Sequence, residues 1–554
     1  MIATRPQNTA ARADSGPGLA LPQGWFGLTI RVVVSDGSTI LPRIAVLLAN
    51  APTRIPTGNG RERFFVKSGS RWPFSIEKAV NEPCRYVPFP FGLAYLAALL
   101  DRDGVDVAVY DGVALNAGAE ALLDYAGTCR PQIVFMETTT PTVDHDLALC
   151  LELKARTGAV IALAGAHATT FAEAILSEHP EVDWILTGEY ELNAQRAIEA
   201  WRAGGERALA GLAGLVHAQA LPDGTRRIVA GPPGAPIEPL DLLPVPARHF
   251  FPTREAPSVW PYWDGFCRHR PAIQMHASRG CPFRCTFCLW VSVMYGNGAY
   301  RTFSPRRVVD EMEQVIRQYG AKEIYFDDDI FTAREVHVLG ICDEIRARQV
   351  RVPWSVMGDA MAVTERAIRA MAHAGCIGMK LGIESANRQV LEQARKPIRL
   401  DKVRDVVGWC SREGIKTHAT ITFGLPGETH ASMQETLDFC RMLSVDSIQF
   451  SVATPFPGTP YYEGARRDGR LLDARWSDFD GNRSAVVRHE GLSAEEIAKF
   501  AARAPSRWLR ARLHDPPWLR RQARYLGEIL ADQGVAGVSR RILRAARLLL
   551  ARPG

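Results

Sequence analysis

Residues 277–288 read Ala-Ser-Arg-Gly-Cys-Pro-Phe-Arg-Cys-Thr-Phe-Cys and follow directly on a predicted strand, Ile273–Ala277. The segment places Cys281, Cys285 and Cys288 in a C-x₃-C-x₂-C spacing. Four thiolates complete the coordination of a [4Fe–4S] cluster, whereas three leave one iron with an open position. An iron with an open position can bind and reduce a small molecule. The spacing therefore predicts a [4Fe–4S] cluster held by these three cysteines.

The residues between and around the cysteines suit a loop that wraps around a cluster. Gly280 favours a tight turn, and Arg279 and Arg284 would offset the negative charge of a cluster. The alternative is a zinc site, in which His276 or Cys267 would be the fourth ligand. Structural zinc sites usually contain two C-x₂-C pairs, so the spacing favours the cluster.

The chain around this loop alternates strand-like and helix-like segments. The predicted strands are Ile273–Ala277, Glu323–Phe326, Val352–Val356, Gly378–Ile383, Lys416–Phe423 and Ser447–Val452. The predicted helices are Ser304–Gln318, Glu335–Arg348, Thr364–Ala374, Leu400–Arg412 and His430–Leu443. Six such units over residues 271–460 predict a partial (β/α)₆ barrel of the TIM type. Its chemistry would lie at the carboxyl ends of the strands.

A second alternating series precedes the barrel. Its predicted strands are Ile44–Leu48, Val105–Tyr110, Ile133–Met136, Val160–Leu163 and Trp184–Thr187. Five short buried strands interleaved with helices predict an α/β domain, a doubly wound, Rossmann-like parallel sheet, over residues 41–235. The Pro- and Gly-rich stretch Leu221–Ala247 indicates a boundary, followed by a linker over residues 236–270. Residues 1–40 are expected to be loose, and residues 461–554 mainly helical.

The amino-acid composition limits which classes of protein the chain can belong to. The 554 residues are 47% hydrophobic and 23% charged, and no segment contains 18 uninterrupted apolar residues, so no membrane span is predicted. The first thirty residues lack the apolar core of a secretory signal, and eleven cysteines without an export signal favour a reducing cytoplasm. The net charge of +6 is concentrated in residues 503–554, which contain twelve arginines and three acidic residues. A basic tail on a slightly acidic body does not predict a nucleic-acid-binding protein.

The cysteine loop at this place in a β/α series resembles the radical S-adenosylmethionine (SAM) superfamily. In that family the open iron binds SAM, and an electron from the cluster cleaves it to a 5′-deoxyadenosyl radical. The resemblance extends to Gly382-Ile383-Glu384-Ser385 and to Gly424-Leu425-Pro426-Gly427-Glu428-Thr429, which end the fourth and fifth strands. The implied SAM contacts are Asp328, Gly382, Glu384, Ser385, Gly424, Pro426 and Gly427.

Two of these assignments have alternatives. Glu384 could accept from the ribose hydroxyls of SAM or could be a solvated carboxylate at a strand end. Asp328 belongs to the acidic triplet Asp327–Asp329, where many radical SAM proteins have Gly-Gly-Glu. A carboxylate there could bind the SAM ammonium group, bind Mg²⁺, or face water.

The domain ahead of the barrel resembles the cobalamin-binding domain of cobalamin-dependent radical SAM enzymes, so that the resemblance spans residues 41–460. The implied cobalamin rim consists of Thr138, Thr139, Gly165, His167, Gly188 and Glu189, all in turns after predicted strands. The chain lacks the Asp-x-His-x-x-Gly motif whose histidine binds cobalt in classical cobalamin mutases. His167 could therefore be a cobalt ligand, a rim contact, or a residue that structures its turn.

The C-terminal segment predicts a basic amphipathic helix. Arg540, Arg541, Arg544 and Arg547 alternate with Ile542, Leu543, Ala546, Leu549 and Leu550, which share one helical face. Such a helix could lie on an anionic membrane surface or pack on the barrel. The chain is expected to be cytoplasmic, with peripheral membrane association through this helix as one outcome.

The resemblance implies a methyltransferase that uses SAM, a [4Fe–4S] cluster and cobalamin to methylate an unactivated carbon of a lipid, isoprenoid or secondary metabolite. The alternative is a related enzyme that closes, contracts or oxidises a ring without adding a methyl group. A non-catalytic membrane scaffold or tRNA-interacting module would rest on the basic tail alone. An electron donor such as flavodoxin or ferredoxin is an implied partner. Aromatic and Met side chains near the cysteines would line a substrate cavity or belong to the core: Trp260, Tyr262, Trp263, Trp290, Met294 and Tyr295.

Overall fold

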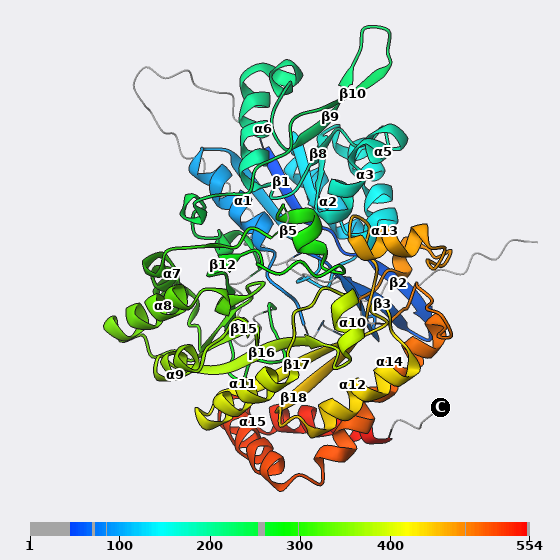
Figure 1. Ribbon diagram of the computed structural model, residues 1–554. Coiled ribbons are helices and arrows are strands. Elements are labelled where there is room, and N and C mark those ends of the chain that lie inside the picture. Colours follow the sequence, from blue (N-terminus) through cyan, green and yellow to red (C-terminus); the bar gives the residue numbers. More distant parts are fainter. Residues whose placement is uncertain are drawn as a thin grey trace, which may run out of the picture. The chain divides into compact units, whose positions relative to one another are not determined.

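The computed structural model describes residues 45–550 apart from 69–72, 83, 85, 253–260, 297 and 482. The segment 1–40 and Trp260 lie outside these residues. Two sheets organise the described chain (Figure 1).

The first sheet has seven strands in the order β10-β9-β8-β7-β6-β1-β5. Its strands are β1 (Ala45–Asn50), β5 (Asp106–Asp111), β6 (Ile133–Glu137), β7 (Val160–Ala164), β8 (Trp184–Leu186), β9 (Leu215–Ala220) and β10 (Arg226–Ala230). The five strands from β5 to β8 are parallel, as predicted. Strand order reverses at β1, and ligands in such sheets bind outside the carboxyl ends of the strands near the reversal.

Helices cover both faces of the first sheet, which makes it doubly wound. They are α1 (Phe91–Arg102), α2 (Ala119–Cys129), α3 (Val143–Thr157), α4 (Ala166–Thr170), α5 (Ala172–Glu178) and α6 (Glu191–Gly204). One face packs against α1 and α6, and the other against α2, α3 and α5. Because both faces are buried, the strands are continuous apolar runs rather than alternating ones.

Two parts of the first half differ from the prediction. Strands β9 and β10 extend the sheet antiparallel, and β10 lies inside the stretch predicted as a boundary. A separate antiparallel sheet of β2 (Arg54–Gly58), β3 (Arg61–Val66) and β4 (Phe74–Ala79) follows β1. Strands β2 and β10 are largely exposed and polar, so they lack the apolar run by which buried strands are recognised.

The second sheet is parallel throughout, in the order β11-β14-β15-β16-β17-β18, and is open between its two edge strands. Its strands are β11 (Ala272–Met275), β14 (Glu323–Phe326), β15 (Trp354–Gly358), β16 (Cys376–Glu384), β17 (Lys416–Phe423) and β18 (Ser447–Val452). The helices between them are α7 (Pro305–Tyr319), α8 (Glu335–Ala347), α9 (Glu365–His373), α10 (Arg388–Gln393), α11 (Leu400–Arg412) and α12 (His430–Met442). This is the predicted partial barrel.

The C-terminal region is mainly helical, as expected, with α13 (Pro460–Arg467), α14 (Ala494–Arg512) and α15 (Pro516–Leu550). Helix α15 is broken at Gly534, whose φ is 65°. In Figure 1 α15 lies below the second sheet and α14 lies at its right, and α14 contacts β18 and α12. Among the described helices, none is both long enough and apolar enough to cross a bilayer.

One hydrophobic core continues from the first sheet into the second. It contains Leu96 and Ile198 from helices of the first domain, and Ile273 and Val356 from strands of the barrel. The carboxyl ends of strands from both sheets can therefore be held at fixed positions around one site.

Candidate active site

The three cysteines lie on a loop that a short antiparallel pair of strands closes. In this pair, β12 (Ser278–Arg279) and β13 (Arg301–Thr302), Arg279 stands directly opposite Arg301. Gly280 has a φ of 86°, and a Cβ atom there would lie 1.9 Å from the carbonyl oxygen of Ala299. Only glycine fits this turn, so Gly280 fixes the entry of the cysteine loop.

The thiols are held in largely apolar surroundings. Cys285 packs with Phe287, Ala394 and Leu425. Burial raises the pKa of Cys285 to about 12 and that of Cys288 to about 11, and it raises the pKa of Cys281 as well. Such thiols bind iron by releasing protons to solvent, so metal binding at this loop is coupled to pH.

The cation that faces the three thiols is Lys396, which follows α10. It lowers the pKa of all three cysteines, although burial dominates. The Lys396 Nζ atom lies 3.2 Å from Oδ2 of Asp359 and 3.9 Å from Oε1 of Glu384. Burial opposes the charge of Lys396, but the two carboxylates outweigh it and raise the pKa of the ammonium group. Sequence reasoning missed both Lys396 and Asp359.

The prediction that Arg279 and Arg284 offset the charge of a cluster is wrong for Arg279. Its guanidinium group is buried and donates to Glu191 Oε1 over 2.6 Å. Arg284 is exposed. Arg279 turns away from the loop because a buried carboxylate of the first domain is within its reach, which no spacing in the sequence reveals.

The zinc alternative finds no support in the positions of the proposed fourth ligands. Cys267 is fully buried among Trp263, Phe266 and Tyr325, and the ring of His276 stacks on Phe91 at a centroid distance of 3.8 Å. Among the described residues, no three His, Cys, Asp or Glu side chains are grouped tightly enough to hold a single metal ion. In a [4Fe–4S] cluster each thiolate binds its own iron atom, so the three sulfur atoms need not converge on one point.

Glu384 ends β16 in a strained conformation. Its φ is 67°, which is rare for a residue other than glycine and is typical of functional sites. Its Oε2 accepts from Thr422 over 2.9 Å, and burial raises the pKa of its carboxyl group. Gly382 leaves room for this carboxylate, because a Cβ there would lie 2.7 Å from Glu384 Oε1. The hydroxyl of Ser385 instead accepts from Asn387 N over 3.1 Å and so shapes the turn.

The turn after β17 needs two glycines with positive φ, Gly424 and Gly427, at 85° and 80°. A Cβ at Gly427 would lie 2.6 Å from the Gln393 amide. Pro426 is partly exposed between them. Glu428, which sequence reasoning did not single out, accepts from Gly424 N over 3.3 Å, and burial raises its pKa to about 7.

The acidic triplet after β14 divides into two roles. Asp328 accepts from Ala277 N over 2.8 Å and from the Ser278 hydroxyl over 2.5 Å, so its carboxylate braces the strand that leads into the cysteine loop. Asp327 and Asp329 line a cavity between the two domains. These two neighbours are therefore better placed than Asp328 for the predicted contact with SAM.

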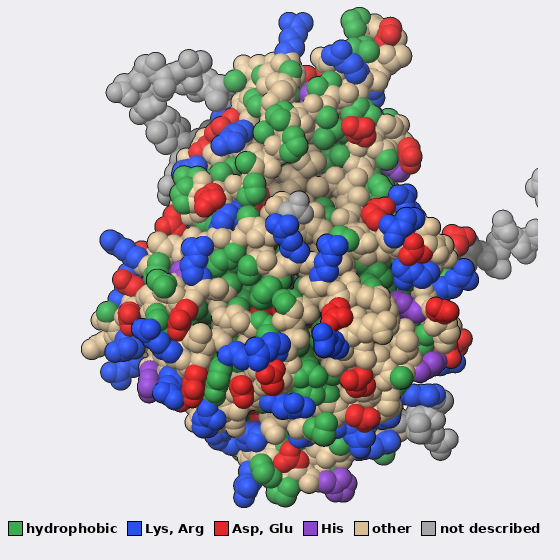
Figure 2. All heavy atoms as spheres, in the orientation of Figure 1, with side chains coloured by type: hydrophobic (Ala, Val, Ile, Leu, Met, Phe, Trp, Pro, Cys, Tyr) green, Lys and Arg blue, Asp and Glu red, His purple; other side chains and the backbone are tan. Residues whose placement is uncertain are grey.

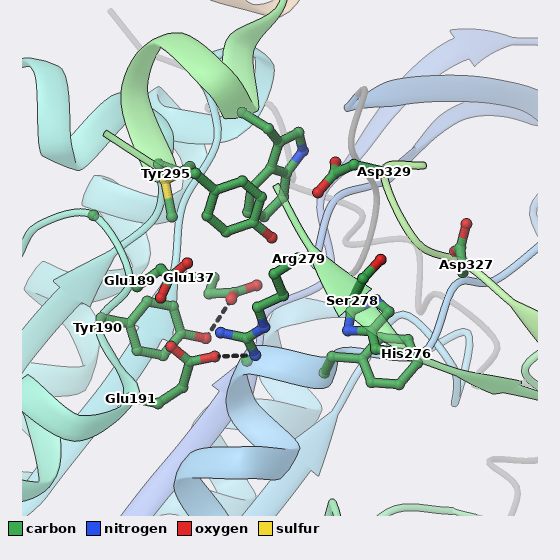
Figure 3. Close-up of a pocket in the computed structure, with 15 residues that line it drawn as sticks. Glu137, Glu189, Tyr190, Glu191, His276, Ser278, Arg279, Tyr295, Asp327 and Asp329 are labelled. Carbon is green, nitrogen blue, oxygen red and sulfur yellow. Dashed lines mark hydrogen bonds and ion pairs between the residues drawn. The ribbon is translucent and has the colours of Figure 1, made fainter. Parts of the chain in front are cut away.

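That cavity is narrow and partly open to solvent (Figure 3). Its walls come from both domains, with Gly188–Glu191 on one side and the cysteine-loop residues Trp290, Met294 and Tyr295 on the other. The last three are therefore cavity residues, and Trp290–Met294 forms a short π-helix, a feature frequent at functional sites. Tyr262 and Trp263 belong to the core instead.

The predicted cobalamin rim follows β6, β7 and β8. A Cβ at Gly165 would lie 2.3 Å from the carbonyl oxygen of Thr138, so the turns after β6 and β7 touch. The Thr138 hydroxyl donates to Asp146 over 2.8 Å, and Thr139 caps the turn through Thr142. Gly188 lines the cavity with a φ of 63°.

His167 is buried and uncharged. Its ring lies between Phe171 and Trp476, and its Nδ1 is 3.2 Å from the Thr140 hydroxyl. Burial lowers the pKa of His167 to about 4. These contacts favour the turn-structuring role over that of a cobalt ligand.

Glu189 and Glu191 join the two domains. Glu189 pairs with Arg301, with 2.8 Å between Oε2 and Nη1, and also accepts from Ile237 N over 2.7 Å. Glu191 pairs with Arg279. All four charged side chains are at most 4% exposed. The Glu189 carboxylate is therefore taken by this interdomain clamp (Glu189–Arg301 and Glu191–Arg279), rather than being free at the predicted rim.

Comparison with known proteins identifies both domains. The radical SAM superfamily matches residues 275–440, and the B12 binding domain matches residues 77–197. An uncharacterised methyltransferase of Pyrococcus horikoshii is 29% identical, over 75% of this chain and 86% of the relative. The anaerobic magnesium-protoporphyrin IX monomethyl ester cyclase of Rubrivivax gelatinosus is 27% identical, over 68% and 66%. The hopanoid C-3 methylase of Methylococcus capsulatus is 26% identical, over 70% and 71%.

Solved structures agree on the fold. The cobalamin-dependent S-adenosylmethionine radical enzyme OxsB has a TM-score of 0.62 and 13% identity, covering 89% of this chain and 72% of that one. The radical S-adenosylmethionine methyltransferase TsrM from Kitasatospora setae has a TM-score of 0.58 and 20% identity, covering 78% and 80%.

Proposed function

Because this chain belongs to the cobalamin-dependent radical SAM enzymes and resembles their methyltransferase class, we propose that it methylates an unactivated carbon of a lipid, isoprenoid or secondary metabolite. The observation that carries the proposal is the cavity shared by the two domains. When bound, the cluster with SAM supplies a hydrogen-abstracting radical, and cobalamin supplies a transferable methyl group. Gly188 of the implied cobalamin rim lines this cavity, and so do Asp327 and Asp329, which flank the implied SAM contact Asp328. A substrate carbon in the cavity could therefore lie near both cofactors.

The residues present fit these groups. Cys281, Cys285 and Cys288 would hold the cluster, since three thiolates leave one iron with an open coordination position for SAM. Gly188 lines the cavity and has only the Met294 carbonyl oxygen near the position of a Cβ atom, at 3.5 Å, so its turn provides the close backbone approach that a corrinoid needs at the edge of the first sheet. Trp290 and Met294 would exclude water from the space between.

The identity of the substrate is the finer part of the proposal. Similarity to the hopanoid C-3 methylase favours an apolar substrate. The exposed Ile542, Leu543 and Leu550 on α15, next to arginines, favour contact with a membrane in which such a substrate would be dissolved. Flavodoxin or ferredoxin would be the electron donor. The second candidate is a ring-closing or oxidising reaction without methyl transfer. It is supported by the sequence identity to the cyclase, 27%, which is close to the identities to the two methyltransferases.

The expected products distinguish the two candidates. After anaerobic reconstitution with iron, sulfide, cobalamin and SAM, the enzyme should form S-adenosylhomocysteine, 5′-deoxyadenosine and methylated product in comparable amounts. Mass spectrometry of metabolites from a deletion strain, incubated with the enzyme, should reveal a product heavier by one CH₂ group. Deoxyadenosine formed under full reconstitution without any methylated product contradicts the methyltransferase and supports the second candidate.

Lys396 is expected to be needed for SAM binding. We propose that its ammonium group balances the charge of the SAM carboxylate and of the cluster, because it faces both the thiols and Glu384. Lys396→Met should weaken SAM binding by roughly tenfold or more, the loss typical of a charge-assisted contact. Equilibrium dialysis and the change in the electron paramagnetic resonance spectrum of the reduced cluster on adding SAM measure this.

A matched control is Lys499→Met, which removes an exposed ion pair with Glu495. It should leave SAM binding unchanged, since exposed pairs contribute little. Equal SAM affinity in the two variants would show that Lys396 has no part in binding.

A further inference from the structure

The surface of the C-terminal region contains a basic hollow. It is a shallow depression that is largely open to solvent, and Arg441, Arg507, Arg510 and His514 line it together with Ala511. Arg441 comes from α12, and the other residues come from α14 and the turn that follows it. The lining residues include no carboxylate, and the Asp438 carboxylate at the edge of the hollow compensates only the charge of Arg441, so Arg507 and Arg510 leave the hollow net positive.

The arginines retain free hydrogen-bonding capacity. Arg441 pairs with Asp438 at 3.2 Å, Arg507 donates to Gln434 Oε1 over 2.8 Å, and Arg510 donates to the carbonyl oxygen of Leu549 over 3.0 Å. Each guanidinium group has five N–H donors, so these contacts leave donors over. Planar N–H pairs of arginine match the oxygens of a phosphate group.

Large apolar side chains protrude next to the hollow. Met442, which follows Arg441, is 69% exposed, and Leu513, which precedes His514, is 43% exposed. Leu550 is 80% exposed and follows Leu549, to whose carbonyl group Arg510 is bonded. In Figure 2 basic and hydrophobic side chains are interspersed with some acidic ones over the lower edge of the molecule, where α15 lies. Charged groups beside protruding apolar side chains fit a lipid surface, where both can be satisfied.

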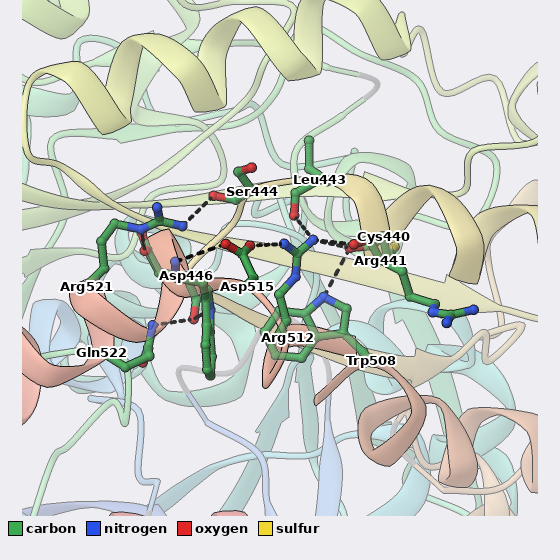
Figure 4. Close-up of polar contacts among 11 residues, drawn as sticks. Cys440, Arg441, Leu443, Ser444, Asp446, Trp508, Arg512, Asp515, Arg521 and Gln522 are labelled. Atoms are coloured by element: carbon green, nitrogen blue, oxygen red, sulfur yellow. Dashed lines mark hydrogen bonds and ion pairs between the residues drawn. The ribbon is translucent and has the colours of Figure 1, made fainter. Parts of the chain in front are cut away.

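The backbone around the hollow is firmly anchored (Figure 4). Arg512 donates to the carbonyl oxygens of Arg441 and Leu443, both over 2.6 Å, and so caps the end of α12. Trp508 Nε1 donates to Cys440 O over 3.1 Å. Because these bonds join α14 to α12, the backbone positions from which the arginines of the hollow extend are fixed relative to one another.

We propose that this hollow binds the phosphate-bearing headgroup of an anionic lipid in a bilayer, while Met442, Leu513 and Leu550 insert among the acyl chains. The site gives the membrane contact proposed for α15 a defined location and chemistry. The inference rests on the proposed function only for its purpose, because a membrane contact would give the enzyme access to an apolar substrate. Binding itself can be tested without cofactors or substrate.

The test is co-sedimentation of the full-length protein with vesicles. The protein should bind vesicles of phosphatidylcholine with phosphatidylglycerol and should bind pure phosphatidylcholine weakly, and salt should weaken the binding. The double variant Arg441→Gln/Arg507→Gln should lower the partition coefficient by roughly tenfold or more, since each basic residue near an anionic surface favours binding. The matched control is Arg466→Gln/Arg467→Gln on α13, which removes two exposed arginines outside the hollow.

Melting by circular dichroism verifies that both double variants are folded, and Leu513→Ser/Leu550→Ser tests the apolar part without changing charge. Equal vesicle binding of the two arginine variants would overturn the proposal, as would equal binding to both vesicle types. If glycerol phosphate abolishes vesicle binding and the protein does not prefer anionic vesicles, the hollow binds a soluble phosphate ligand and the proposal is overturned. Protection of the hollow by an RNA oligonucleotide, but not by vesicles, would overturn the proposal as well.

Methylation of a detergent-dispersed substrate should persist in the variants. If the wild type binds vesicles but forms no methylated product, the proposed function fails and the lipid site stands.

Discussion

Cys285→Ala is expected to yield a folded protein without a [4Fe–4S] cluster and without detectable radical chemistry. Cys285 is one of only three thiolates predicted to hold the cluster, and its environment of Phe287, Ala394 and Leu425 accepts an alanine side chain. Removing one sulfur atom from a core costs about 1 kcal/mol, so the fold should persist. Iron and sulfide analysis, the visible absorption of the reconstituted protein and deoxyadenosine formation all measure the loss.

Cys267→Ala is the matched control. This thiol is also buried, but it lies in a different apolar cluster with Trp263 and Tyr325. Its removal should leave the iron content unchanged. Retention of iron by Cys285→Ala would contradict the cluster. Stoichiometric zinc in the wild type that both variants lose would contradict it too and would support the zinc site.

Arg301→Met is expected to separate radical formation from product formation. The substitution leaves the Glu189 carboxylate buried without its charge partner, which costs about 3–5 kcal/mol of stability. Because Arg301 and Arg279 stand on the two strands that close the cysteine loop, breaking the clamp should let this loop shift relative to the first sheet. The yield of methylated product per deoxyadenosine should then fall, while the spectrum of the cluster changes little.

Urea unfolding and product ratios test this in a double-mutant cycle with Glu189→Met. The double variant should recover part of the lost stability, because it buries no unpaired charge. Arg369→Met, which breaks an exposed pair with Glu365, should change stability by less than about 1 kcal/mol. An unchanged product ratio in a destabilised Arg301→Met would show that the clamp serves stability alone.

The sequence predicted most strands of the two parallel sheets. Strands β17 and β18 occupy the residues expected of them, because their Thr, Ile, Phe and Val residues favour strands and they lie between helical segments. Strands β2 and β10 were missed because they are exposed and polar. The turn Gly58–Gly60 was an available signal for the hairpin of β2 and β3, since its residues have the positive φ that such turns require.

The candidate site was predictable only where a motif is local in sequence. The cysteine triplet and the glycine turns are contiguous, so their spacing reveals them. Lys396 follows α10, more than a hundred residues after the cysteines, and pairs with Asp359 near them only in the folded chain. Arg279 pairs with Glu191 across the boundary between the two domains. Asp359 was within reach of sequence reasoning, because it directly follows β15 at the edge where barrel chemistry is expected.

The interdomain clamp has a consequence for how such proteins can be recombined. Glu189 and Glu191, separated by one residue where α6 begins, bind arginines on both sides of the cysteine loop, so the first domain helps to hold the loop that belongs to the second. A corrinoid-binding domain transplanted from another protein would have to bring an acidic Gly-Glu-x-Glu turn in the same place. Without it, two buried arginines would meet an apolar or basic surface. The two halves of this chain are therefore not interchangeable parts, and their interface restricts the partners with which each half can be combined.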